Sequence, residues 1–281
     1  DVLGSRGLGD VYKRQVLTAA MLTTLAAPAF AKTWDIEKGD ITVKAGEAEG
    51  PNKVKQGDSD FVKDEGATII TGTSDKNTVT IDTSEGNVDV TFDDLKIDAS
   101  SRVNPSATTL NDASYAAVNV TGKGDTNIEL NGDNELKSGR NRAGLEHNQT
   151  ADSEGNVTSG KLTIQDDKDN AGSLTAMGGE FAAGIGGGNA NAGQVTITGG
   201  NITATGGDGS AGIGGGYGQG SPNPNAGDGD VTISGGTIKA AGGTFGAGIG
   251  GGYYGNGTVT ITGDAAVSYT HLRAHETLRH L

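Results

Sequence analysis

The chain has 281 residues, of which 50 are glycine and none is cysteine, and its formal net charge is −14. The missing cysteines exclude a disulfide framework and zinc–thiolate sites. The acidic balance argues against nucleic acid as a partner, because phosphate binding rests on basic side chains. Glycine is more than twice its usual share of about 7%, and its regular spacing argues against a flexible linker.

The two ends differ from the rest of the chain. Residues 1–15 and 268–281 resemble translated sequencing-adapter sequence found at the ends of metagenomic gene fragments. We expect residues 1–15 and most of 265–281 to be non-native, with the natural protein truncated at its C-terminus. Three of the four histidines lie in the last stretch, so we do not interpret them as metal ligands.

Residues 16–31 are predicted to be a secretory signal peptide. Val16–Ala27 is apolar, and the Ala-Phe-Ala that ends at Ala31 suits signal peptidase cleavage. The apolar run is too short to span a bilayer, and no second one follows. We therefore expect a secreted, extracellular protein without a transmembrane segment, attached to a cell surface, if at all, through a missing C-terminal region.

The mature chain begins with an edge or capping segment, residues 32–66, which carries many charges and only short alternating pieces. Alternation of apolar and polar residues then becomes regular, as in Val79–Ile81 and Val88–Phe92. A period of two between turn-forming residues predicts strands. We assign residues 67–264 to one repetitive domain.

The repeat is built around Ala-Gly-Ile-Gly-Gly-Gly, found at 183–188, 211–216 and 247–252. Two strand-like segments precede each copy, such as Val195–Gly200 and Ile202–Gly207. Self-similarity at a period of 20–50 residues is typical of solenoids. So many glycines and β-branched residues would not sustain helices.

Matching positions recur after 28 or 36 residues, and the extra eight fall in the turn-rich Gly218–Asn225. About six coils of roughly 28 residues, each with three short strands, can be traced. The predicted fold is all-β, a single-stranded parallel β-helix, and the long coil favours right-handedness. The predicted core positions of one coil are Val195, Ile197, Ile202, Ala204, Ala211 and Ile213.

A degenerate coil lies upstream of the regular ones. Asn127–Leu130 takes the place of Val-Thr-Ile-Thr, and Glu135–Gly139 takes that of Ile-Thr-Ala-Thr-Gly. Ala143–Leu145 stands for Ala-Gly-Ile. We therefore expect the coil pattern to begin well before the first Ala-Gly-Ile-Gly-Gly-Gly.

The first candidate ligand-binding residues form a column four positions after each repeat isoleucine. They are Asn189, Tyr217 and Tyr253, with Tyr254 adjacent. Tyrosine offers a flat apolar face with a polar rim, which suits sugar rings; the alternative is that these rings only cover a glycine-rich turn. Phe181 and Phe245 share another position, which we assign to packing.

The glycines of the repeat are the second candidate. Alternation turns Gly186, Gly214 and Gly250 away from the core, which predicts a bare face that an extended glycan could approach. The alternative interpretation is a set of tight corners that need glycine.

Acidic clusters are the third candidate, and here the ligand is a metal. Asp166, Asp167 and Asp169 form one cluster, and Asp228 and Asp230 form another. Turn carboxylates are candidate Ca²⁺ ligands, but neither cluster matches an EF-hand loop. We expect that the protein requires no cofactor and that Ca²⁺ is the metal these clusters could bind. The alternative interpretation is that the aspartates lie on solvated turns and bind no metal.

Catalytic signals are sparse. Arg140 and Arg142 near Glu146 and His147 form the single mixed cluster, and no nucleophile–base set can be assembled with supporting spacing. We therefore expect a protein that is not an enzyme.

Residues 33–264 resemble secreted glycine-rich parallel β-helix proteins of anaerobic Gram-positive bacteria, described as carbohydrate-binding domain-containing proteins. The matching features are the repeated Ala-Gly-Ile-Gly-Gly-Gly with Val-Thr-Ile-Thr-Gly-Gly and the upstream Ala143–Glu146. The resemblance implies a pectate-lyase-like shape and binding of polysaccharide or of a cell-wall or host glycan. We expect a monomeric, adhesin-like glycan binder; the alternatives are an extracellular polysaccharide lyase and a structural surface spacer.

Overall fold

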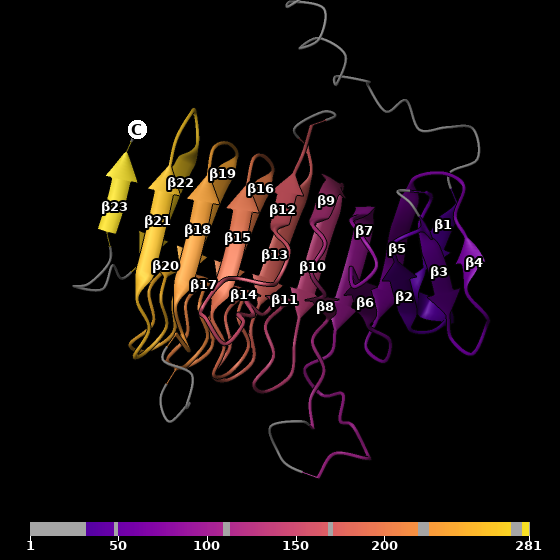
Figure 1. Cartoon of the computed structure of the whole chain (residues 1–281), viewed down its shortest axis with the longest axis horizontal. Coiled ribbons are helices and arrows are strands. Elements are labelled where there is room, and N and C mark those ends of the chain that lie inside the picture. The colour runs from indigo at the N-terminus through magenta and orange to yellow at the C-terminus, as the bar shows by residue number, and fades with distance from the viewer. Residues whose placement is uncertain are drawn as a thin grey trace, which may run out of the picture.

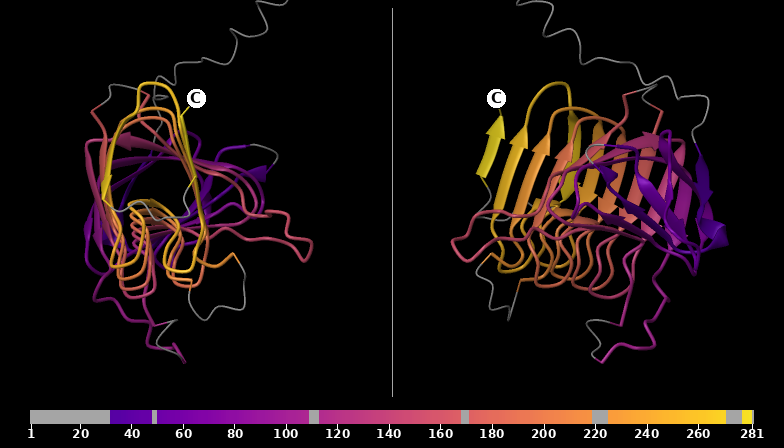
Figure 2. Two further views of the ribbon diagram at one scale, coloured as in Figure 1. Left: turned by 90° about the vertical axis from the view of Figure 1, so that its left-hand side faces the viewer. Right: turned by 45° about the vertical axis from the view of Figure 1, so that its right-hand side comes forward.

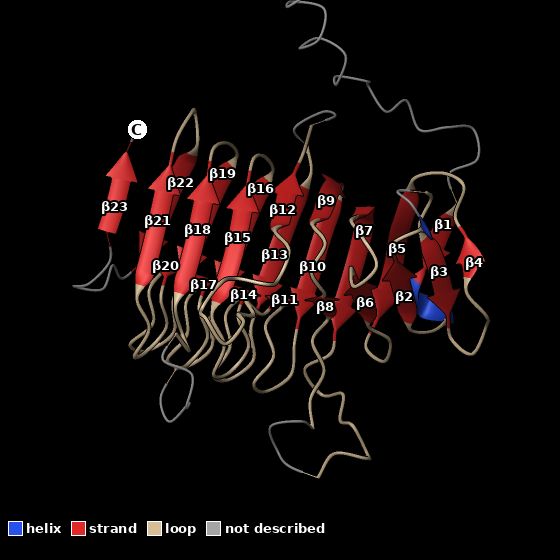
Figure 3. Cartoon of the chain, in the orientation of Figure 1, coloured by secondary structure: helices blue, strands red, loops and turns tan. Residues whose placement is uncertain are grey.

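The computed structural model describes residues 32–47, 50–108, 113–167, 171–218, 225–270 and 277–280. In these residues strands dominate, and a short 3-10 helix (η1) spans Ile36–Lys38 (Figure 3). None of the described helices has the length and apolar character needed to cross a bilayer. The predicted signal segment lies outside the described residues.

Three ladders of strands run along the molecule (Figure 1). The first ladder contains β1 (Thr33–Asp35), β5 (Thr68–Ser74), β7 (Val88–Asp98), β9 (Thr126–Asn131), β12 (Leu162–Gln165), β15 (Gly193–Ile197), β18 (Gly229–Ile233), β21 (Gly257–Ile261) and β23 (Thr277–His280). The second ladder contains the later parts of β5 and β7, then β10 (Asp133–Lys137), β13 (Ser173–Met177), β16 (Asn201–Thr205), β19 (Thr237–Ala241) and β22 (Ala266–Thr270). The third ladder contains β4 (Val62–Lys63), β3 (Lys53–Gln56), β2 (Ile41–Lys44), β6 (Val79–Asp82), β8 (Val118–Thr121), β11 (Leu145–His147), β14 (Ile185–Gly186), β17 (Ile213–Gly214) and β20 (Ile249–Gly250).

The register of the ladders matches the predicted repeat. Ile213 pairs in parallel with Ile249, and Val231 pairs in parallel with Val259. Each coil from β9 to β20 gives one short strand to each ladder, and the coils superpose in the view along the long axis (Figure 2, left). This confirms a single-stranded parallel β-helix. In β5 and β7 the first two strands of a coil are fused into one.

The core fills the inside of the coils. All six predicted inward residues of the β15–β17 coil are at most 1% exposed: Val195, Ile197, Ile202, Ala204, Ala211 and Ile213. Stacked Val, Ile and Leu side chains make one continuous buried cluster from Trp34 to Val259. Each buried CH₂ group contributes about 0.8 kcal/mol, and a single coil cannot bury its apolar face alone.

The degenerate coil is correctly placed, but two of its strands are shifted by one residue from the prediction. Leu145 pairs with Ile185 as expected. Thr126, however, stands opposite Leu162, and Asn134 stands opposite Leu174. Both polar residues are at most 2% exposed. An apolar pattern cannot reveal such core positions, because their occupants are polar.

Asn134 fits the core because hydrogen bonds satisfy its side chain. Its Oδ1 accepts from the Leu95 backbone N–H at 2.9 Å. Its Nδ2 donates to the carbonyl oxygens of Asn131 and Ser173, each at 3.0 Å. A buried amide that is fully hydrogen-bonded avoids the desolvation cost of an unpaired polar group.

The N-terminal segment both extends and closes the helix. β1 and β2 pair in parallel with β5 and β6, while β3 and β4 fold back antiparallel at the edge of the third ladder. The indole N–H of Trp34 donates to the Asp64 carboxylate at 2.8 Å. The antiparallel strands cover an edge that would otherwise present unpaired backbone groups.

Candidate functional site

Two loops flank each short strand of the third ladder and project together on one side of the molecule (Figure 2, left). The leading loops, before the strand, are residues 138–144, 178–184, 206–212 and 242–248; the trailing loops, after it, include 187–192 and 251–256. Backbone hydrogen bonds join the trailing loop of one coil to the leading loop of the coil before it. These are Asn189 N to Asn141 O at 3.0 Å, Tyr217 N to Phe181 O at 3.1 Å, and Tyr253 N to Gly209 O at 2.6 Å.

Because these loops meet, aromatic residues from both loop sets form one aromatic row: Phe181, Tyr217, Tyr253, Phe245 and Tyr254. The ring centroids of Phe181 and Tyr217 are 5.0 Å apart, and those of Tyr217 and Tyr253 are 5.7 Å apart. Tyr253 also contacts Phe245 at 5.3 Å and Tyr254 at 4.3 Å. Tyr253 is therefore the centre of the row. The row holds five of the chain's twelve aromatic residues, which are one Trp, six Tyr and five Phe.

Backbone conformation projects part of the row outward. Phe181, Phe245 and Tyr254 adopt left-handed conformations with φ of 70°, 67° and 64°. This region costs an ordinary residue about 1–2 kcal/mol. Phe245 and Tyr254 are 66% and 62% exposed in the described part of the chain. Two large apolar side chains are thus held in strained positions that keep them in contact with solvent, and such strain clusters at functional sites.

The structure brings Tyr217, Tyr253 and Tyr254 together, as the sequence suggested, and adds the two phenylalanines that we had assigned to packing. Asn189 takes the corresponding place in the coil before Tyr217, where its carbonyl accepts from Asn191 Nδ2 at 2.8 Å. The sequence does contain a pattern that identifies the position of Phe181 and Phe245. Asn141 and Gly209, both residue types that tolerate left-handed backbone, occupy the repeat position of the phenylalanines.

The repeat glycines lie beneath this surface. Gly186, Gly214 and Gly250 are buried, and the backbones of successive coils pack so closely there that a Cβ on Gly186 would overlap the Gly214 carbonyl. Their backbone is therefore covered by neighbouring coils, and we do not include these three glycines in the proposed binding surface.

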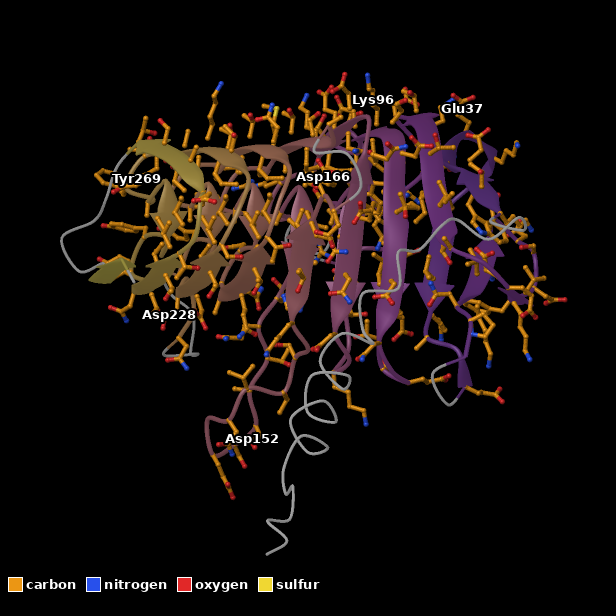
Figure 4. All side chains as sticks on the ribbon, turned by 90° about the horizontal axis from the view of Figure 1, so that it is seen from above. Glu37, Lys96, Asp152, Asp166, Asp228 and Tyr269 are labelled. Carbon is orange, nitrogen blue, oxygen red and sulfur yellow. The ribbon has the colours of Figure 1, made fainter. Side chains whose placement is uncertain are left out.

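The predicted acidic clusters are dispersed. Asp166 follows β12 and Asp228 precedes β18, so they lie at opposite ends of first-ladder strands. Figure 4 shows the two residues well apart. Asp167 and Asp230 are exposed, and Asp169 lies outside the described residues. Among the described residues, no group of three or more His, Cys, Asp or Glu is arranged to hold a metal ion.

Asp166, which is buried, and Asp228, which is half-buried, both accept hydrogen bonds from the backbone. Asp166 is 3% exposed, and its Oδ2 accepts from the Gly172 N–H at 2.9 Å. Asp228 Oδ1 accepts from the Asn256 N–H at 2.6 Å. Burial raises the pKa of Asp228 above its ordinary value, against the lowering effect of this bond.

The mixed cluster is divided between surface and core. Arg140 lies on the surface, where its Nε is 3.2 Å from Glu180 Oε2 and its guanidinium is 5.3 Å from the Phe181 ring. Glu146 is fully buried, and its Oε1 is 3.0 Å from Arg142. His147 is also buried; its Nδ1 lies 3.0 Å from the Gln194 carbonyl, and burial lowers the pKa of the ring.

Glu146 has an evident structural role. It stands opposite Gly186 in the third ladder, and its Oε2 accepts from the Ala143 N–H at 3.0 Å. In the next coil the Ala183 N–H donates instead to the Gly187 carbonyl, also at 3.0 Å. The Glu146 carboxylate therefore replaces the backbone acceptor that the glycine-rich coils supply, and burial raises its pKa.

Comparison with known families agrees with this architecture. Residues 170–189, 195–217 and 231–253 match a family model described as a beta helix repeat. The chain is a parallel β-helix protein. The matched segments end at Asn189, Tyr217 and Tyr253, so the aromatic row begins within the repeat itself. Searches of curated proteins and of solved structures gave no significant match.

Proposed function

We propose that this β-helix is a secreted or cell-surface protein that binds polysaccharide through the aromatic row and does not catalyse a reaction. The observation that carries the proposal is the exposure of Phe245 and Tyr254, which both contact the Tyr253 ring and both have left-handed backbone conformation. Aromatic rings with one apolar face and, in tyrosine, a polar rim suit the apolar faces and hydroxyl groups of sugars.

The rigidity of the row supports binding of an extended ligand. Tyr217 and Tyr253 come from successive coils, and their backbones are bonded to the opposite loops. A preorganised surface loses little side-chain entropy when a ligand binds. Because the rings follow the long axis of the helix, a glycan that touches several of them lies across the coils.

The surroundings of the mixed cluster support a non-catalytic role. Glu146 and His147 are buried, and Glu146 already accepts from Ala143, Asn148 and Arg142. The secreted location is proposed from the apolar Val16–Ala27 and the Ala-Phe-Ala that follows it.

The test is glycan-array and pull-down binding by the full chain, with insoluble plant and bacterial cell-wall polysaccharides as probes. The double variant Tyr217→Ala, Tyr253→Ala is expected to lose affinity by at least about tenfold. Phe61→Ala is the matched control, because Phe61 is a partly exposed aromatic residue in the N-terminal segment. Each binding assay is run with added Ca²⁺ and with a chelator, and binding is expected in both.

The other functions predict different results. A chain that binds no glycan would support a structural spacer. Unsaturated products from polyuronate would support a lyase. Unchanged binding by the double tyrosine variant would remove the aromatic row as the site.

A further inference from the structure

The leading loops carry a second row of side chains, one residue ahead of the left-handed position that holds the two phenylalanines. These four residues, here the polar row, are Arg140, Glu180, Asp208 and Thr244, and all are exposed. The loop tips stack closely from coil to coil. A Cβ on Gly207 would lie 3.0 Å from Glu180 Cα, and one on Gly243 would lie 3.0 Å from Asp208 Cα.

Within this row, Asp208 directly precedes Gly209, the residue that contacts both Tyr217 and Tyr253. The next residue, Gly209, has no side chain, and the Tyr217 ring packs into that space so closely that a Cβ there would overlap the ring. The Gly209 carbonyl accepts from Tyr253, and its N–H donates to the Thr244 carbonyl at 2.8 Å. Asp208 is therefore one residue from the backbone position that contacts both tyrosines, and it lies one coil from Phe245.

The charges of the polar row are not balanced. Glu180 is paired with Arg140 at 3.2 Å. Asp208 has no ion pair with any described residue. An ionised carboxylate accepts hydrogen bonds and donates none, so it suits hydroxyl groups and repels another anion.

We propose that Asp208 is a specificity-determining residue of the aromatic row, which accepts hydrogen bonds from sugar hydroxyls and selects neutral glycans over uronate-containing ones. This inference rests on the proposed glycan-binding function and deepens it. The aromatic rings supply apolar contact to any sugar, while the carboxylate sets orientation and discriminates by charge. A uronate chain along the row would meet this uncompensated negative charge.

The experiment measures binding of the full chain to neutral glucan, xylan and mannan and to polygalacturonate by affinity electrophoresis. Asp208→Ala is expected to weaken binding to the best neutral polysaccharide by about tenfold, as loss of a hydrogen bond to a charged group predicts. Asp208→Asn is expected to improve binding of polygalacturonate relative to the neutral polysaccharide. This gain should shrink at about 1 M salt, where charges are screened within roughly 3 Å.

The matched control is Asp75→Ala, which removes the same charge from an exposed turn near the N-terminal coils. This variant is expected to bind the neutral polysaccharide and polygalacturonate as the natural protein does. If Asp208→Ala behaves like Asp75→Ala while the double tyrosine variant loses binding, the role of Asp208 is overturned and the glycan site stands. Tighter binding of polygalacturonate than of every neutral polysaccharide would also overturn it. If no polysaccharide binds, the proposed function itself fails.

Discussion

Gly209→Ala tests whether the aromatic row depends on a missing side chain. Gly209 has φ of 69°, so alanine there costs about 1–2 kcal/mol through its left-handed backbone alone. The new Cβ would also overlap the Tyr217 ring, which would have to move by roughly 1 Å to regain normal carbon–carbon separation. Overpacking of this kind adds about 1–3 kcal/mol. We expect a total destabilisation of about 3 kcal/mol.

Two matched variants separate the backbone cost from the steric cost. Gly155 has φ of 85°, and a Cβ there meets nothing within 4 Å, so Gly155→Ala reports the left-handed backbone alone, about 1–2 kcal/mol. In a Tyr217→Ala background the ring is absent, and Gly209→Ala should cost no more than Gly155→Ala. The cycle should therefore show a coupling of at least about 1 kcal/mol between positions 209 and 217.

The assay is urea unfolding followed by far-ultraviolet circular dichroism, with the near-ultraviolet tyrosine signal recorded on the same samples. Gly209→Ala should also change the near-ultraviolet spectrum of the folded protein, because the Tyr217 ring leaves its place between Phe181 and Tyr253. The packing described for the aromatic row is wrong if Gly209→Ala lowers the free energy of unfolding no more than Gly155→Ala does. It is also wrong if Gly209→Ala has the same effect with and without the Tyr217 ring.

The remaining predictions concern stability. Val231→Asp puts a charge at a fully buried position of the first ladder and should lower the free energy of unfolding by about 3–5 kcal/mol, measured by urea unfolding. The substitution of its outward neighbour, Thr232→Asp, should cost about 1 kcal/mol or less, and equal effects would refute the register. Glu146→Gln removes a buried carboxyl whose pKa is raised above 4.5 by burial. Below pH 4.5 this group is protonated in both folded and unfolded chains. As the pH rises, the unfolded chain ionises first, so the natural protein should lose stability relative to the variant until the raised pKa is passed. Urea midpoints of the two proteins between pH 4 and 8 measure this, and a constant difference would contradict it.

Much of the fold could be read from the sequence, because the repeat is regular and its inward positions are apolar. Spacing alone predicted the partnership of Ile213 with Ile249. It also predicted an insertion at Gly218–Asn225, most of which lies outside the described residues. In the degenerate coil, apolar spacing did not predict the register of two strands. Asn134 and Thr126 occupy the core as polar residues, and only the stacked coils reveal that Asn134 has its hydrogen-bond partners there.

The candidate site was predictable only in part. The common spacing after each repeat isoleucine identified Tyr217 and Tyr253, since equal positions in successive coils must stack. The sequence alone thus determined the β-helix, the register of its regular coils and one column of aromatic residues, because these follow from a period along the chain. The tertiary structure decided that the repeat glycines are buried and that Phe181 and Phe245 join the tyrosines. The physical reason is that leading and trailing loops come from different coils and meet through backbone hydrogen bonds across the short third strand, a contact that no period along the chain encodes.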